Sequence, residues 1–82
     1  MVTVRYFAAA RAAAGVTSED VDMAEGATVG DALNAIAARH GDGLGKVLTG
    51  CSFLLDSVAV RDRATPLPAA AELDVLPPFA GG

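Results

Sequence analysis

The chain has 82 residues, enough for one small domain. Its composition, with 52% hydrophobic and 20% charged residues, is that of a folded globular protein rather than a disordered one. Six basic residues are scattered among ten acidic ones, for a net charge of −4. This balance argues against a nucleic-acid partner, because binding to phosphates needs clustered lysine and arginine.

The sequence contains no apolar run near the roughly 20 residues that span a bilayer, so we expect no membrane partner. Its first residues, Met1–Arg5, lack the basic and then apolar pattern of a secretory signal peptide. We therefore expect a cytoplasmic protein.

Cysteine and histidine, which often carry chemistry, occur once each. Cys51 precedes an apolar run, which predicts a buried and inert thiol. His40 falls in the last turn of a predicted helix, where a partly positive ring suits the helix C-terminus. No second cysteine or histidine stands at metal-ligand spacing, so we expect no metal site and no nucleophile–base pair.

The N-terminal third predicts two strands joined by a short helical segment. Val2–Phe7 alternates, with its even-numbered residues on one face. Ala8–Ala14 is alanine-rich and is closed by Gly15, which favours a short helix or turn. Thr17–Met23 alternates again and predicts an edge strand antiparallel to the first, where its acidic side chains would discourage aggregation.

The main helix is predicted from Thr28 to His40. Thr28 and Asp31 have the spacing of a capping box, with Asp31 in place of the usual glutamate or glutamine. Apolar residues then recur at helical spacing and form one stripe that would pack on the sheet. The stripe consists of Val29, Ala32, Leu33, Ile36 and Ala37.

The next segments predict a second pair of strands. Leu44–Thr49 is a linking segment with room for one helical turn. Phe53–Leu55 is apolar on both sides, which favours a central strand. Asp56 and Ser57 form a two-residue turn candidate, and Val58–Val60 predicts the returning strand.

The last third predicts a loop and a final strand. Residues 61–68 are polar and interrupted by proline, Ala69–Ala71 is a turn or short helix, and Leu73–Leu76 is the last strand, expected beside the first. The order of elements predicts an α+β domain over residues 1–76, with a mixed sheet of four to five strands packed on one main helix. An extended tail, residues 77–82, would follow.

The tail combines a stiff root with a thin tip. Two prolines hold φ at about −65° and donate no N–H, so the segment leaves the domain extended. Gly81 and Gly82 have no side chains and let other groups approach the backbone closely, although a terminal Gly-Gly pair can also be accidental. We expect the Gly82 carboxylate to react inside a narrow site on a partner. The inserted segment would be Pro77, Pro78, Phe79, Ala80 and Gly81.

On these residues the chain resembles the small, sulfur-carrying subunit of molybdopterin synthase, a ubiquitin-like β-grasp family. The tail is the most specific part of the resemblance, and the opening strand is the next. The matching residues are Val4-Arg5-Tyr6-Phe7-Ala8 with Arg11 and Gly15, Thr28-Val29, Pro66-Leu67 and Leu76–Gly82.

Three positions depart from the pattern of that family. Asp56 stands where the family usually has asparagine. Ala69–Ala71, followed by Glu72, stands where it usually has Gly-Asp or Asp-Gly-Asp. Phe79 stands where valine is common, at a place where a partner would grip the tail.

The resemblance implies a carrier that is not an enzyme by itself and holds no permanent cofactor. A ubiquitin-activating-type adenylating enzyme would use ATP to convert the Gly82 carboxylate to an acyl-adenylate. A sulfur donor protein would then supply the sulfur of a Gly82 thiocarboxylate. The tail would enter the large synthase subunit and deliver that sulfur to a pterin precursor.

Partner docking is expected near the root of the tail. The candidate residues are Phe7, Phe53, Leu55, Leu76 and Arg11. A core position is the alternative for the four apolar residues, and a solvated helix face is the alternative for Arg11.

Other functions remain open at this point. The chain could be a sulfur carrier for thiazole or cysteine synthesis, with the same tail chemistry and another acceptor. It could be a ubiquitin-like protein modifier, with Gly82 joined to lysines of other proteins. A binding module whose tail has no chemistry is the alternative from a different class.

Overall fold

A computed structural model describes residues 1–78 of the chain. These residues fold into a mixed five-stranded sheet and three helices. None of the helices in this range is long and apolar enough to cross a membrane. The elements, in chain order, are β1 (Val2–Tyr6), α1 (Ala8–Ala14), β2 (Ser18–Val21), α2 (Val29–His40), α3 (Asp42–Leu48), β3 (Ser52–Leu55), β4 (Val58–Ala59) and β5 (Glu72–Leu76).

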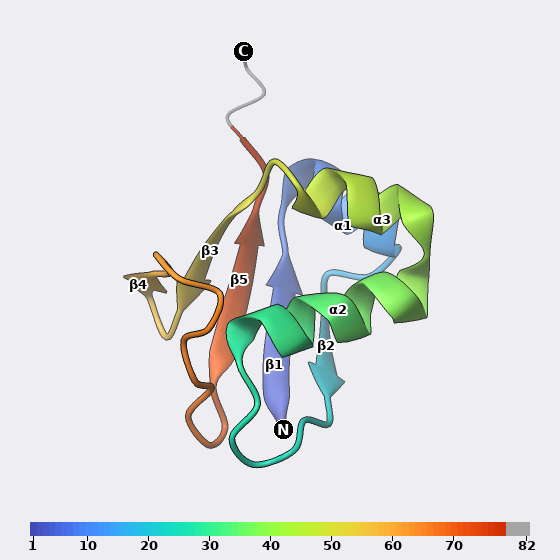
Figure 1. Ribbon diagram of the computed structural model, residues 1–82. Coiled ribbons are helices and arrows are strands. Elements are labelled where there is room, and N and C mark those ends of the chain that lie inside the picture. Colours follow the sequence, from blue (N-terminus) through green and yellow to red (C-terminus); the bar gives the residue numbers. More distant parts are fainter. Residues whose placement is uncertain (79–82) are drawn as a thin grey trace.

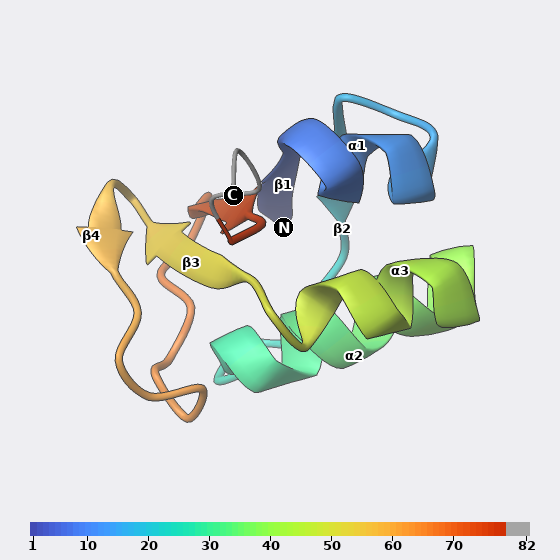
Figure 2. The ribbon, with the colours of Figure 1, turned by 90° about the horizontal axis from the view of Figure 1, so that it is seen from above.

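The first and last strands pair in the middle of the sheet, as predicted. The strand order is β2-β1-β5-β3-β4, with β1 parallel to β5 and the other neighbours antiparallel. Helices α2 and α3 lie across one face, and α1 lies at the end of the sheet where β5 finishes (Figures 1 and 2). The segment after β5 therefore starts from the centre of that end.

The core lies between the helices and the covered face of the sheet. Strand residues alternate between faces, and the alternate positions of β1, β3 and β5 are buried together with the apolar stripe of α2. Helix α3 adds two leucines. The main members are Val2, Val4, Tyr6, Val29, Ala32, Leu33, Ile36, Leu44, Leu48, Phe53, Leu55, Leu73 and Val75.

The capping box of α2 is confirmed. The Thr28 hydroxyl accepts the Asp31 N–H at 3.2 Å, and the Asp31 carboxylate accepts the Thr28 N–H at 2.9 Å. The next two N–H groups of the helix donate to carbonyls of the loop after β4. Val29 donates to Thr65 at 2.9 Å and Gly30 to Arg63 at 2.8 Å. The start of α2 therefore also anchors that loop.

Several predicted boundaries were wrong. The linking segment at Leu44–Thr49 is the seven-residue helix α3, because Leu44 and Leu48 lie one turn apart and are both buried. Strands β2 and β4 are shorter than predicted. Within residues 1–78, one backbone bond continues from β4 toward β3 after Ala59, from the Val60 N–H to the Phe53 carbonyl at 2.9 Å.

Ala70 occupies a strained backbone position in the turn before β5. Its φ is 55°, in the left-handed region that costs an L-residue with a Cβ roughly 1–2 kcal/mol. The resemblance places glycine in this stretch, and glycine would remove the strain.

We expect Ala70→Gly to raise the free energy of unfolding by about 0.5–1 kcal/mol, since the relief of strain exceeds the extra backbone entropy of glycine. Urea denaturation followed by circular dichroism measures the change. Ala69→Gly is the matched control. Because Ala69 has no positive φ, glycine at this position should lower the free energy of unfolding slightly. Equal effects at both positions would contradict this account of Ala70.

Glu19 joins the edge strand β2 to the end of α2. Its carboxylate accepts hydrogen bonds from Tyr6 Oη at 2.5 Å, Arg39 Nη1 at 2.8 Å and the His40 ring. Burial, the largest single influence, raises the pKa of Glu19, but the three hydrogen bonds and the His40 charge together outweigh it and lower that pKa. Burial and the bond to Glu19 raise the pKa of Tyr6, so its hydroxyl stays protonated and donates.

Glu19→Gln should lower the free energy of unfolding by about 1–2 kcal/mol at neutral pH, because it weakens three charge-assisted hydrogen bonds. A lowered folded-state pKa stabilises the fold above the ordinary value of 4.5, and this contribution is lost as the pH falls through the folded pKa. The difference between the two proteins should therefore shrink below pH 4.5.

Denaturation across a pH series measures this difference. Glu25→Gln is the control, since Glu25 is exposed and makes no hydrogen bond or ion pair with residues 1–78. A Glu19→Gln difference that is independent of pH would argue against ionised Glu19 as the stabilising group.

Candidate functional site

The segment after β5 leaves the domain at the centre of the sheet end (Figure 1). Pro77 is half-buried and Pro78 is exposed. The ring of Pro78 lies against Gly50 in the connection between α3 and β3, where an added Cβ would be 3.7 Å from its Cγ and Cδ atoms. Pro78 is thus supported by the domain. The predicted tail residues 79–82 lie outside the described residues.

Phe7 and Leu76 lie side by side at the root of this segment. The β1–β5 register pairs Tyr6 with Val75, and the Phe7 N–H donates to the Val75 carbonyl at 3.2 Å. Both side chains therefore point to the face of the sheet opposite the helices. Phe7 is 37% exposed, and its ring centroid is 5.5 Å from the Arg5 guanidinium carbon. These two residues form an accessible apolar surface beside the tail.

The docking prediction needs correction at Phe53 and Leu55. They are only 6% and 9% exposed and belong to the core. Because residues of a strand alternate between faces, Ser52 and Leu54 are the residues of β3 on the face opposite the helices, and the apolar one, Leu54, is half-buried opposite Asp74. Leu54 was not among the predicted docking residues, although alternation in a strand that packs by Phe53 and Leu55 could have indicated it.

Arg11 is exposed on α1, one helical turn beyond Phe7, whose carbonyl accepts the Arg11 N–H at 3.4 Å. It makes no ion pair with another residue of the 1–78 range. Its role in docking stays a prediction.

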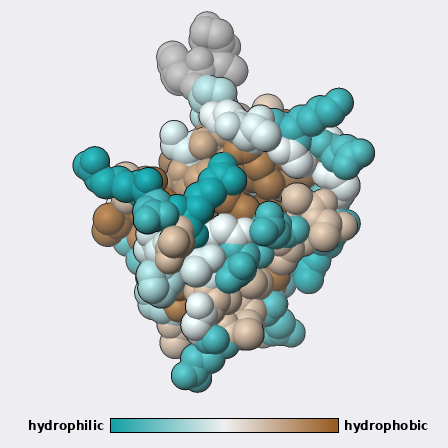
Figure 3. Space-filling view, in the orientation of Figure 1, coloured by the Kyte–Doolittle hydropathy of each residue, from teal (hydrophilic) through white to brown (hydrophobic). Residues whose placement is uncertain are grey.

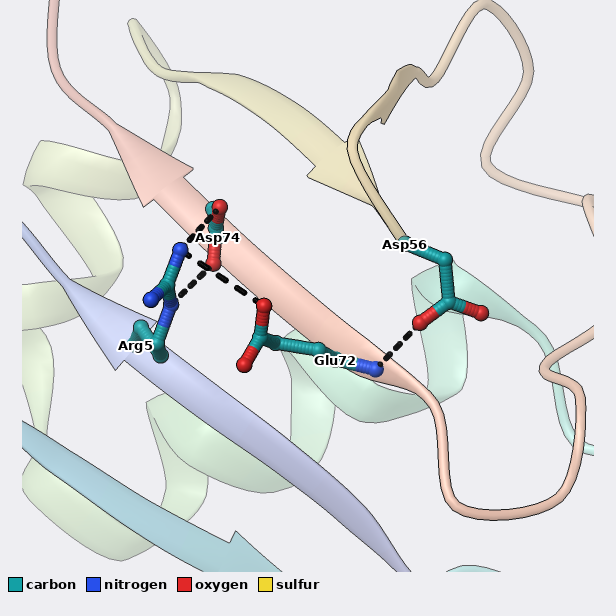
Figure 4. A network of polar contacts seen from close by, with 4 residues as sticks. All are labelled: Arg5, Asp56, Glu72 and Asp74. Carbon is teal, nitrogen blue, oxygen red and sulfur yellow. Dashed lines mark hydrogen bonds and ion pairs between the residues drawn. The ribbon is translucent and has the colours of Figure 1, made fainter.

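A polar network lies on the same face of the sheet, the face opposite the helices (Figure 4). Arg5 binds Asp74 through two bonds, Nε to Oδ1 at 2.7 Å and Nη2 to Oδ2 at 2.9 Å, and it lies 3.5 Å from Glu72. The hydrogen bond to Asp74 raises the pKa of Arg5 above its ordinary value. Asp74 is 5% exposed, so this ion pair joins the two central strands in a partly buried setting.

Asp56 ties the β3–β4 turn to the start of β5. Its backbone N–H donates to the Glu72 carbonyl, and its carboxylate accepts the Glu72 N–H, both at 2.8 Å (Figure 4). Asp56 and Ser57 have positive φ values of 47° and 71°, typical of a two-residue hairpin turn. The Asp56 carboxylate oxygen can therefore accept the same kind of backbone hydrogen bond as the side-chain oxygen of an asparagine at this position in the family.

Cys51 lies near the tail root with its thiol engaged. Sγ donates to the Val47 carbonyl at 3.1 Å. Burial raises the pKa of the thiol, and the nearby Arg63 charge only partly offsets this. A protonated thiol is a poor nucleophile. The predicted burial of Cys51 is only partial, since the residue is half-buried, and its inertness stays a prediction. Within residues 1–78 no group of three or more His, Cys, Asp or Glu residues is placed to hold a metal ion.

Comparison with known proteins places this geometry in a family. The family model described as the ThiS family matches residues 4–82. The molybdopterin synthase sulfur carrier subunit of Chlamydomonas reinhardtii is 34% identical over 82 residues, which cover 99% of this chain and 98% of that protein.

Solved structures agree with the fold. The crystal structure of SAMP1 from Haloferax volcanii has a TM-score of 0.86 and 29% identity, over 99% of this chain and 98% of that one. A chain in the complex of subunits 1 and 2 of the molybdopterin-converting factor from Helicobacter pylori has a TM-score of 0.71 and 25% identity. The match covers 99% of this chain and 97% of that one. The ubiquitin-like β-grasp prediction is confirmed, and the chain belongs to the ThiS family.

Proposed function

We propose that this protein is a sulfur carrier for molybdopterin synthesis whose reacting group is the Gly82 carboxylate. The observation that carries the proposal is the 34% identity to a molybdopterin synthase sulfur carrier subunit across 99% of the chain. A central strand that leads into a proline-supported segment is the geometry that such a carrier needs, because the end of the chain must reach beyond the domain.

The chemistry takes place on the terminal carboxylate in two steps. A carboxylate oxygen attacks the α-phosphate of ATP on an adenylating enzyme, and pyrophosphate leaves. Sulfide from a sulfur donor protein then attacks the acyl carbon, so that a C–S bond forms, the C–O bond to AMP breaks and a thiocarboxylate remains. Its polarisable sulfur can attack a pterin precursor in a partner's site.

The chain's own residues contribute position rather than acid–base chemistry. Pro77 and Pro78 limit the conformations of the tail, which reduces the entropy lost when it enters a narrow site. Phe7 and Leu76 offer apolar contact beside it. The partners would supply the catalytic groups. The Helicobacter pylori structure, a complex of subunits 1 and 2 of a molybdopterin-converting factor, favours a large synthase subunit as one of these partners.

The direct test is the intact mass of the protein after incubation with ATP, a sulfide source and a candidate adenylating enzyme. We expect one oxygen to be exchanged for one sulfur, and fragmentation should locate the exchange at Gly82. Omission of ATP is the control and should leave the mass unchanged. No exchange with a panel of adenylating enzymes would count against a sulfur carrier.

A second candidate function is modification of other proteins. The similarity to Haloferax volcanii SAMP1, named in a related structure as a small archaeal modifier protein, favours it. In that case Gly82 would form an isopeptide bond with a lysine of a target. Tagged protein expressed in cells would then give covalent ladders that survive denaturation, whereas a dedicated sulfur carrier would give none.

Cys51→Ala should leave sulfur transfer unchanged within about twofold, since the thiol is protonated and bonded to Val47. Thiocarboxylate formation by mass spectrometry is the measurement. Loss of transfer in a variant that retains its circular dichroism spectrum would give the thiol a direct role.

A further inference from the structure

Strand β2 is the longer of the two strands at the edges of the sheet. The strand order places β2 at one edge and β4 at the other, and β4 has two residues against four in β2. On its inner side β2 pairs with β1, and no strand of residues 1–78 pairs with its outer side. Figure 1 shows β2 at the margin of the sheet beside β1. The outer side of β2 is therefore an unpaired strand edge.

The register of β1 and β2 shows which backbone groups point outward. The Tyr6 N–H donates to the Thr17 carbonyl at 2.9 Å, so this pair is hydrogen-bonded, and every second pair along an antiparallel ladder is as well. Ser18 and Asp20 belong to the alternate pairs, in which N–H and C=O groups point away from the partner strand. Thr3, which faces Asp20, accordingly directs its own N–H toward the start of β5. The N–H and C=O groups of Ser18 and Asp20 therefore point away from the sheet.

These outward groups have no partner in the described part of the chain. No hydrogen bond to the backbone of Ser18 or Asp20 occurs within residues 1–78. Both residues are exposed, whereas Val21, whose side chain faces the helices, is buried. Two N–H groups and two C=O groups are thus available to a further extended segment, as in the recognition of peptides by strand addition.

The charge along this edge is negative after the ion pairs of β2 are counted. Glu19 is bound to Arg39 and His40, so its charge is compensated within the domain. Asp20 and Asp22 are exposed and form no ion pair with residues 1–78. Figure 3 shows several hydrophilic side chains along the margin of the molecule on the side of β2.

Neighbouring cations do not cancel the two aspartates. Arg5, on the same face of the sheet, is bound to Asp74 and also lies 3.5 Å from Glu72, so acidic groups already outnumber it. The Met1 ammonium stands one residue before β1 and carries a single charge. The edge therefore keeps a negative charge, in agreement with the net charge of −4 of the whole chain.

We propose that the outer edge of β2 binds an extended, basic segment of a partner protein, which adds to the sheet as a further strand. The backbone groups of Ser18 and Asp20 would pair with the segment's backbone, and its lysines or arginines would lie beside Asp20 and Asp22. A second copy of this chain does not fit, because its own β2 would bring like charges across the new pairing. Strand β1 lies between β2 and β5, so the segment would bind away from the strand that leads to the tail. The surface does not depend on any reaction at Gly82.

The test is a titration of the isotope-labelled chain with a synthetic peptide of alternating lysine and threonine, followed by NMR at low ionic strength. We expect shifts centred on residues 17–22. Hydrogen exchange of the Ser18 and Asp20 amides should slow, whereas the Glu19 and Val21 amides, which already bond to β1, should change little. This alternation is the signature of strand addition.

Two control peptides separate backbone pairing from charge. A peptide with glutamate in place of lysine should give no shifts. The same lysine peptide with methylated backbone nitrogens keeps its charge but loses its donors, and it should not slow exchange at Ser18 or Asp20. Absence of shifts with the lysine peptide, or an equal effect of either control, would overturn the proposal. Shifts of β2 that grow with protein concentration without peptide would also overturn it, because a second copy would then occupy the edge.

Variants of the chain locate the site. Asp20→Asn with Asp22→Asn should weaken binding of the lysine peptide about fivefold, because two exposed charge contacts are lost. Asp42→Asn with Asp62→Asn makes the same change of net charge at exposed residues of other elements and should leave binding unchanged. Ser18→Pro removes an outward N–H but no bond to β1, so it should weaken binding in a chain that keeps its fold. Equal weakening by the Asp42 and Asp62 changes would refute this edge as the site.

Discussion

Deletion of Gly82 should lower sulfur transfer by about 100-fold or more while the domain stays folded. The deletion moves the terminal carboxylate back by one residue, about 3.5 Å along an extended chain. Misplacement of a reacting group by as little as roughly 1 Å can cost a factor of 100. Because β5 ends at Leu76, the sheet should not change. Thiocarboxylate formation and pterin product measure transfer, and circular dichroism checks the fold.

Two glycine variants make this test specific. Gly82→Ala keeps the length and the carboxylate but adds a methyl group at the tip, so its transfer should fall between that of the wild type and the deletion. Gly43→Ala changes an exposed glycine whose Cβ would meet nothing within 4 Å, and it should transfer normally. Normal transfer by the deletion would exclude Gly82 as the reacting residue.

Arg5→Met should lower the midpoint of thermal unfolding by roughly 10–20 °C. The change removes the two Arg5 N–H groups that bond to the Asp74 carboxylate, and Asp74 is only 5% exposed. A buried carboxylate without a partner is costly, whereas methionine preserves the packing of the arginine stem. Thermal unfolding followed by circular dichroism measures the shift.

A second change at the same pair tests whether the unpaired Asp74 carboxylate causes the lower midpoint. Arg5→Met combined with Asp74→Leu should recover most of the midpoint, because apolar residues of similar volume can replace a buried ion pair. Arg11→Met, at an exposed arginine without an ion pair in the 1–78 range, should shift the midpoint by no more than about 2 °C. Failure of the double variant to recover would point to packing rather than charge.

Local patterns were sufficient to predict most elements. The alternation of Val2–Phe7 and the capping box of Thr28 and Asp31 depend on neighbours within a few residues. Both have the predicted structure, although the strand ends at Tyr6 and Phe7 caps α1 instead. The two-residue turn at Asp56 and Ser57 also follows from local preference. Predicted ends were less accurate at Leu44–Thr49, where burial of two leucines extends the segment into a helix.

The docking surface shows where sequence patterns were insufficient. An apolar run such as Phe53–Leu55 does not indicate which of its alternate residues face the helices. Packing of α2 and α3 on one face decides this, and it buries Phe53 and Leu55 while Leu54 remains on the other side. Phe7 and Leu76 become neighbours only through the parallel pairing of the first and last strands.

The sequence by itself determined the element order, the main helix with its cap, the membership in a β-grasp family and the Gly-Gly tail as the candidate for chemistry. These features depend on local periodicity and on short motifs. Only the tertiary structure decided the Arg5–Asp74 pair, which joins residues 69 positions apart, and the apolar surface of Phe7 and Leu76 at the root of the tail. Both depend on the register and the ends of strands, which the packing of the whole domain sets.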